Sequence, residues 1–129
     1  EGAKELVRVL CPGGGQGEGA GRAESPSALR VLDLRWNNLS GPAATVLAQG
    51  LVSAPAGLAE LNLSWNSIGD EGARALAAAL PLSVALACVI VDNCSIRTPG
   101  AEALAAAVGT LSAGRGCRLQ SLCMSHNAI

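Results

Sequence analysis

An eleven-residue pattern that returns four times in one register constrains this chain more than any other feature of its sequence. Apolar residues stand at positions 1, 4, 6 and 11 of each copy, and successive copies are shifted by 29, 28 and 33 residues. Self-similarity at this period indicates a solenoid of stacked structural repeats. The copies occupy residues 29–39 (LRVLDLRWNNL), 58–68 (LAELNLSWNSI), 86–96 (LACVIVDNCSI) and 119–129 (LQSLCMSHNAI).

Each of the first three copies leads into an alanine-rich segment with a helical spacing of larger residues. Leu or Val recurs four residues apart in these segments, which places both residues on one face of an α-helix. Alanine fills these segments and has the highest helix propensity, and small residues also let each helix lie close to its neighbour. The sequence therefore predicts a strand followed by a helix in each repeat. The spaced pairs are Leu47 and Leu51, Leu76 and Leu80, and Leu104 and Val108.

The pattern resembles the leucine-rich repeat L-x-x-L-x-L-x-x-(N/C)-x-L. Repeats of 28 to 29 residues with a full helix resemble the ribonuclease-inhibitor-like subfamily. The resemblance implies an α/β solenoid, or horseshoe, with parallel strands on the concave face and α-helices on the convex face. It also implies that the position-9 side chain points inward and satisfies backbone groups of the turn and the next coil. This structural ladder would consist of Asn37, Asn66, Cys94 and Asn127.

The register divides the chain into parts of one repeat region spanning residues 1–129. Because Gly2, Leu6 and Leu10 match helix positions of a later repeat, we expect residues 1–10 to be the helix of a partial repeat. Neither end carries a polar cap, so we expect a fragment of about four repeats from a longer solenoid. The other parts are a glycine-rich insertion at 11–28, repeats at 29–57, 58–85 and 86–118, and a truncated strand at 119–129. Helix-to-strand loops are expected at 11–26 and 109–117.

The composition argues against several classes of ligand. The net charge is −1, so no basic excess is present to bind nucleic acid. The five cysteines include no C-x-x-C pair, which favours free thiols in the cytoplasm over a disulfide framework or a zinc site. We expect no cofactor and no metal. The N-x-S motifs at Asn38, Asn62 and Asn93 fall where the repeat itself supplies Asn and Ser, so we interpret them as chance matches.

Two other segments partly match sequence patterns of other classes, namely a dinucleotide-binding motif and a membrane helix. Residues 15–20 match G-x-G-x-x-A, but the predicted order is helix, loop, strand, whereas a dinucleotide site needs a strand first and a helix after it. Residues 75–91 contain no charge over 17 residues, but a membrane helix needs about 20. The repeat register explains that stretch as a helix end, a loop and a buried strand.

Candidate binding residues lie on the outward face of the predicted strands and at the strand ends. Both tryptophans, Trp36 and Trp65, fall at position 8 and are the only aromatic residues apart from one histidine. Tryptophan is enriched at binding hot spots, but the rings can equally pack on the turn at the strand end, and the sequence leaves both readings open. Charges of both signs nearby favour a protein partner. The candidates are Arg30, Asp33, Arg35, Trp36, Glu60, Asn62, Trp65, Asp92, Asn93 and His126.

His126 is the only histidine, and no nucleophile or acid accompanies it at motif spacing. We therefore expect a non-catalytic scaffold that binds a protein partner and no membrane. A cytoplasmic subunit of a larger cytoskeletal or ciliary assembly fits the resemblance. The alternative is a regulatory repeat domain of a GTPase-activating protein or of a NOD-like immune sensor.

Overall fold

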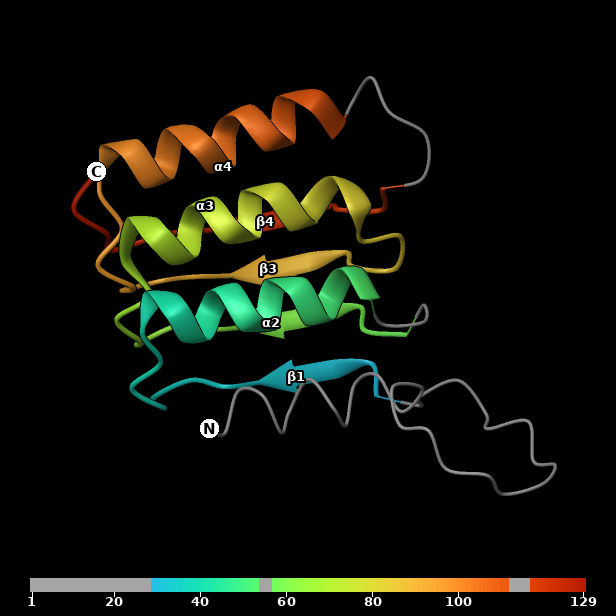
Figure 1. Cartoon of the computed structure of the whole chain (residues 1–129), viewed down its shortest axis with the longest axis horizontal. Coiled ribbons are helices and arrows are strands. Elements are labelled where there is room, and N and C mark those ends of the chain that lie inside the picture. Colours follow the sequence, from blue (N-terminus) through green and yellow to red (C-terminus); the bar gives the residue numbers. More distant parts are fainter. Residues whose placement is uncertain (1–28, 54–56, 112–116) are drawn as a thin grey trace, which may run out of the picture.

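The four strands form one parallel sheet in chain order (Figure 1). The computed structural model describes residues 29–53, 57–111 and 117–129. Leu32 pairs with Leu61, Leu61 with Val89, and Val89 with Leu122, so the strands keep the shifts of the sequence alignment. The predicted register is therefore confirmed. The strands are β1 (Val31–Asp33), β2 (Glu60–Asn62), β3 (Cys88–Ile90) and β4 (Ser121–Cys123).

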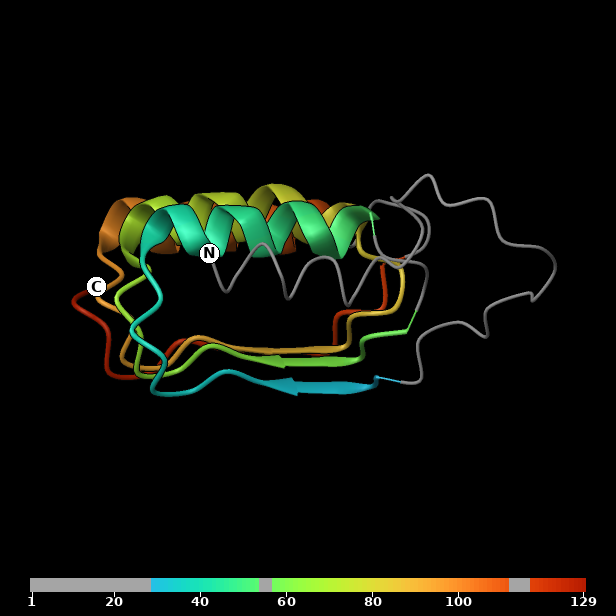
Figure 2. The same cartoon turned by 60° about the horizontal axis from the view of Figure 1, so that its bottom comes forward.

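The helices lie in one layer against one face of the sheet (Figure 2). Pro81 ends the α-helical ladder of the second helix, since proline has no backbone N–H, and the chain continues as a 3-10 turn. The last helix reaches Leu111, so its final turn takes up the start of the loop that the sequence predicts from Gly109. Thr110 supports that turn by donating from Oγ1 to the carbonyl of Ala107 at 2.7 Å. The elements are α2 (Gly41–Ser53), α3 (Gly69–Ala79), η1 (Leu80–Leu82) and α4 (Thr98–Leu111).

The core between sheet and helices is aliphatic in the described part of the chain. The inward positions 4, 6 and 11 of the repeat meet the spaced leucines of the helices there. Burying one such side chain contributes about 1.5–3 kcal/mol. Residues with an exposed fraction of 1% or less include Leu61, Leu63, Ile68, Leu76 and Leu104.

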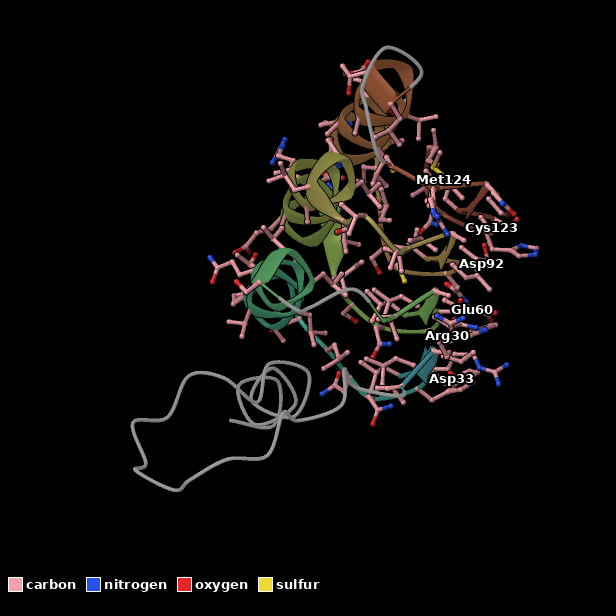
Figure 3. All side chains as sticks on the ribbon, turned by 90° about the vertical axis from the view of Figure 1, so that its right-hand side faces the viewer. Arg30, Asp33, Glu60, Asp92, Cys123 and Met124 are labelled. Atoms are coloured by element: carbon pink, nitrogen blue, oxygen red, sulfur yellow. The ribbon has the colours of Figure 1, made fainter. Side chains whose placement is uncertain are left out.

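Small residues set the distance between neighbouring helices, as the sequence predicts. A Cβ atom on Gly72 would lie 2.7 Å from Cβ of Ile68 and 2.9 Å from Cβ of Ala44. Both distances are shorter than real carbon contacts, so α3 can approach α2 only because residue 72 is glycine. Adjacent strands lie about 4.8 Å apart, whereas packed helices need about 8–10 Å. The stack therefore bends with the sheet on its concave side (Figure 3).

The position-9 ladder is present, but it runs in the opposite direction from the expected one. Oδ1 of Asn66 accepts hydrogen bonds from the backbone N–H groups of Asn37 at 3.0 Å and Leu39 at 2.9 Å. Nδ2 of Asn66 donates to the carbonyls of Leu34 at 2.9 Å and Leu63 at 2.7 Å. The side chain thus joins its own turn to the preceding coil, not to the next one. The backbone agrees with this direction, because Ser67 in the same turn donates to the carbonyl of Leu39 in the preceding coil at 2.9 Å.

The other ladder members follow this geometry to different extents. Asn127 repeats it by accepting from Cys94 and Ile96 and donating to Val91. Cys94 keeps the donor role, since its thiol lies 3.1 Å from the carbonyl of Leu63, but it has no amide oxygen. Asn37 is exposed, and among the described residues its amide donates to the carbonyl of Arg35 in its own turn at 2.9 Å.

Several sequence predictions fall where the structure describes nothing. These are the helix over 1–10, the insertion over 11–28 with its glycine motif at 15–20, and most of the loop over 109–117. Within the described ranges, none of the helices has both the length and the apolarity needed to span a bilayer.

Candidate protein-binding surface

The strand face of the sheet, which points away from the helices, carries the predicted charged residues. Figure 3 shows Arg30, Asp33, Glu60 and Asp92 on this side. Side chains alternate across a strand, so Glu60 and Asp33, at positions 3 and 5 of the repeat, lie on the face opposite to the buried position 4. Arg30, at position 2, is exposed just before β1, and Asp92, at position 7, is half-buried just after β3. The role of these residues in binding stays a prediction.

All four residues at position 8 share a left-handed backbone conformation. Their φ angles are 60° at Trp36, 59° at Trp65, 50° at Asn93 and 55° at His126. This conformation turns the chain from the strand end toward the helix. It costs most residues about 1–2 kcal/mol, and Asn tolerates it better than bulky side chains do. Nothing in the sequence pattern indicated it, and it makes tryptophan a costly choice at this position.

The two tryptophans stack on each other instead of entering the core. Their ring centroids lie 4.3 Å apart with an angle of 11° between the planes. The exposed fraction is 69% for Trp36 and 45% for Trp65. An aromatic pair contributes about 0.5–1.5 kcal/mol beyond its buried area, which roughly offsets the backbone cost of one left-handed residue. The free energy of stacking alone therefore does not explain why both positions carry tryptophan.

The charges nearest this stack neutralise each other. Arg35 contacts Asp33 through Nε at 3.0 and 2.9 Å, and through a terminal nitrogen at 2.7 Å. The Arg35 side chain, by donating to the carboxylate, lowers the pKa of Asp33. Both groups stay ionised at neutral pH, so the pair adds no net charge beside Trp36.

Three of the predicted binding residues also hold the backbone. Asp33 accepts from the N–H of Arg35 at 3.1 Å, Asn62 from the N–H of Ser64 at 3.0 Å, and Asp92 from the N–H of Ser125 at 2.6 Å. Ser64 itself is only 4% exposed, although position 7 was expected to point outward. Its hydroxyl accepts from the N–H of Asp92 at 3.3 Å and so sits within the sheet edge. These roles depend on the strand neighbours and were missed in the sequence.

The remaining predicted residues lie at the two ends of the strand face. Arg30 and Glu60 stand near the strand starts. Five residues separate Arg30 from Trp36 and four separate Glu60 from Trp65, at about 3.3 Å per residue. Asn93 and His126 extend the position-8 column beyond the tryptophans, with His126 exposed and Asn93 half-buried. No group of three His, Cys, Asp or Glu side chains able to hold a metal ion occurs among the described residues.

Two further polar groups have structural roles. Oδ1 of Asp70 accepts from the N–H groups of Arg97 at 2.8 Å and Gly100 at 3.1 Å, so a residue of α3 caps the start of α4. This cap crosses between repeats, which is why no local capping motif indicates it. Burial raises the pKa of the Cys94 thiol, and Cys88, Cys117 and Cys123 are free thiols as well.

Comparison with known proteins agrees with this architecture. The Leucine Rich repeat family model matches residues 27–48 and 58–77, which contain β1 and β2 and extend into the helices that follow them. No curated protein matches the chain. The matched segments, the confirmed register of all four strands and the polar ladder at position 9 lead to one conclusion: the part of the chain that the structure describes is an α/β solenoid of leucine-rich repeats.

Proposed function

We propose that this chain is a non-catalytic scaffold that holds a protein partner on its strand face, with Trp36 and Trp65 as the anchor. Leucine-rich repeats generally mediate protein–protein interaction. The observation that supports the proposal is the exposed tryptophan stack at backbone positions that disfavour large side chains. Tryptophan offers a large rigid contact area and dominates the binding energy of many interfaces.

The finer assignment is to the ribonuclease-inhibitor-like subfamily. Its support is the repeat length of 28 to 29 residues and the full helices, which have 13, 11 and 14 residues. Within that subfamily we propose a cytoplasmic subunit of a cytoskeletal or ciliary assembly. The chain consists of repeats, and its strand face carries charges of both signs. Both features support a partner that is a protein.

The test is affinity capture of partners by the full-length protein, with and without the tryptophan pair. Asn is the replacement to use, since Asn93 already occupies the same column with the same backbone conformation. The double variant Trp36→Asn with Trp65→Asn should lose the partner while its circular dichroism spectrum stays unchanged. Arg74→Ala, an exposed change on α3, serves as the matched control and should retain the partner.

Equal capture by the double variant and the wild type would refute the proposal. Capture of a GTPase together with stimulation of GTP hydrolysis at catalytic amounts would instead favour the regulatory alternative. Capture of a nucleotide-binding domain would favour an immune sensor.

A further inference from the structure

Two free thiols stand on neighbouring strands of the strand face. Cys88 begins β3 and Cys123 ends β4, and both side chains are half-buried. The two residues flank the register pair Val89 and Leu122, which occupies the buried position 4 of the repeat. Because side chains alternate along a strand, both thiols lie on the face opposite to the core. Figure 3 shows Cys123 on this side of the stack.

Ser121 lies between the two thiols. It is the register partner of Cys88 on β4, and its Oγ lies 3.7 Å from Sγ of Cys123. Residues two apart on a strand are about 6.6 Å apart along the backbone, so this contact requires the two side chains to lean toward each other. The Cys123 thiol is therefore closer to the level of Cys88 than its backbone position alone implies.

The distance between the two cysteines suits a bridging atom better than a direct bond. Strands about 4.8 Å apart and a diagonal step of two residues place the two Cα atoms about 8 Å apart. A disulfide needs Cα atoms within about 6.8 Å, and it holds its sulfurs about 2.05 Å apart. An ion bound in line by both sulfurs holds them about 4.6 Å apart, since a metal–sulfur bond is about 2.3 Å long. Only the bridge has the reach that this diagonal pair requires.

The number of ligands selects the ion. Thiolates favour soft ions, chiefly Cu(I) and Zn²⁺. Structural zinc takes four protein ligands and catalytic zinc takes three. Over residues 29–53, 57–111 and 117–129, no group of three His, Cys, Asp or Glu side chains is arranged to hold a metal. Cu(I), by contrast, forms stable complexes with two thiolates in a line, so the pair fits Cu(I) and does not fit zinc.

The charges around the pair also favour a cation. Glu60 is the register partner of Cys88 on β2, and Asp92 follows the end of β3 on the next coil. Their carboxylates attract a positive ion and repel an anionic thiol compound such as glutathione. A mixed disulfide with an anionic thiol is therefore disfavoured here.

We infer that Cys88 and Cys123 bind one Cu(I) ion between them, with the Ser121 hydroxyl donating to the Cys123 sulfur. Each thiol releases its proton to solvent and binds as a thiolate, so the site with its ion carries one negative charge. The ion enters and stays as Cu(I), so no electron is transferred. The cysteine spacing in the sequence could not indicate this site, because only the pairing of β3 with β4 brings the two residues together.

The first experiment tests whether the two thiols are close enough to share a ligand. The reduced full-length protein is treated with dibromobimane, which fluoresces only after both of its ends have alkylated thiols, and the linked peptides are identified by mass spectrometry. A link between Cys88 and Cys123 that Cu(I) prevents is the expected result. No such link in the folded protein, or one that Cu(I) leaves unchanged, would overturn the inference.

The second experiment measures binding without oxygen, by competition between the full-length protein and the coloured Cu(I)–bicinchoninate complex. Cys88→Ser and Cys123→Ser should each withdraw one equivalent less of Cu(I) than the wild type. Cys117→Ser is the matched control and should equal the wild type, because its Sγ lies elsewhere, 3.5 Å from the carbonyl of Leu80. Ser121→Ala should weaken binding about tenfold, as the loss of a hydrogen bond to a metal ligand does.

X-ray absorption of the protein with one equivalent bound gives the coordination number, which should be two sulfurs. Three or four ligands, displacement of Cu(I) by excess Zn²⁺, or equal uptake by the wild type and Cys88→Ser would each contradict the site.

Discussion

Replacing Asn66 by Leu tests the ladder that ties the coils together. Its side chain bonds five backbone groups, namely the N–H groups of Asn37 and Leu39 and the carbonyls of Leu34, Leu63 and Ser64. Leucine leaves all five without this partner, and a buried orphaned group costs about 1–3 kcal/mol. Some of these groups are only part-buried, so water replaces part of the loss. We expect a total cost of about 3–5 kcal/mol, a large share of the 5–15 kcal/mol that stabilises a typical domain.

The chain supplies its own controls for this prediction. Asn66→Cys keeps a donor, as the thiol of Cys94 does toward Leu63, but removes the acceptor, so it should cost about half as much. Cys94→Asn restores an acceptor on the next coil and should stabilise by about 1 kcal/mol.

Urea unfolding, followed by circular dichroism, measures these differences in the free energy of unfolding. The reasoning requires the order Asn66→Leu, Asn66→Cys, wild type, Cys94→Asn from least to most stable. An Asn66→Leu protein with the wild-type midpoint would refute it.

Three further predictions concern other groups. The Cys94 thiol, whose pKa is raised by burial, should resist Ellman's reagent at pH 8 in the native protein and react on unfolding; fast native labelling of Cys94 would contradict its burial. Asp33 has a pKa below its unfolded value, so its pair with Arg35 stabilises above the unfolded pKa and is lost as pH falls through the folded pKa. Arg35→Gln should therefore raise the Asp33 pKa in a carbon-13 titration, and an unchanged titration curve would argue against the pair. Gly72→Ala should cost about 1–3 kcal/mol through overpacking, and Ala44→Gly in the same chain should recover part of the lost melting temperature; no recovery would place the clash elsewhere.

The sequence by itself determined the solenoid, its register and its core. Apolar residues at positions 4 and 6 of each repeat have the two-residue period of a strand, and the spaced leucines that follow have the period of a helix. A one-residue slip of the strand pairing would turn Leu61 and Leu63 outward. With the shifts of 29, 28 and 33 residues, only one sheet pairing buries every copy in the same way. The column that holds Trp36 and Trp65 follows from the same register. These features depend on local patterns that repeat, so the linear chain contains them.

Only the tertiary structure decided how the side chains between coils are used. It showed that Asn66 bonds the preceding coil, that Asp70 caps the helix of the next repeat and that Ser64 is buried. It also showed that Trp36 and Trp65 stack face to face on left-handed residues. Each of these contacts joins residues about one repeat apart, and its geometry depends on the backbone angles at the turn and on the strand spacing of about 4.8 Å. Hydrophobic periodicity specifies neither quantity, so the arrangement of the proposed binding surface follows only from the stacking of the coils.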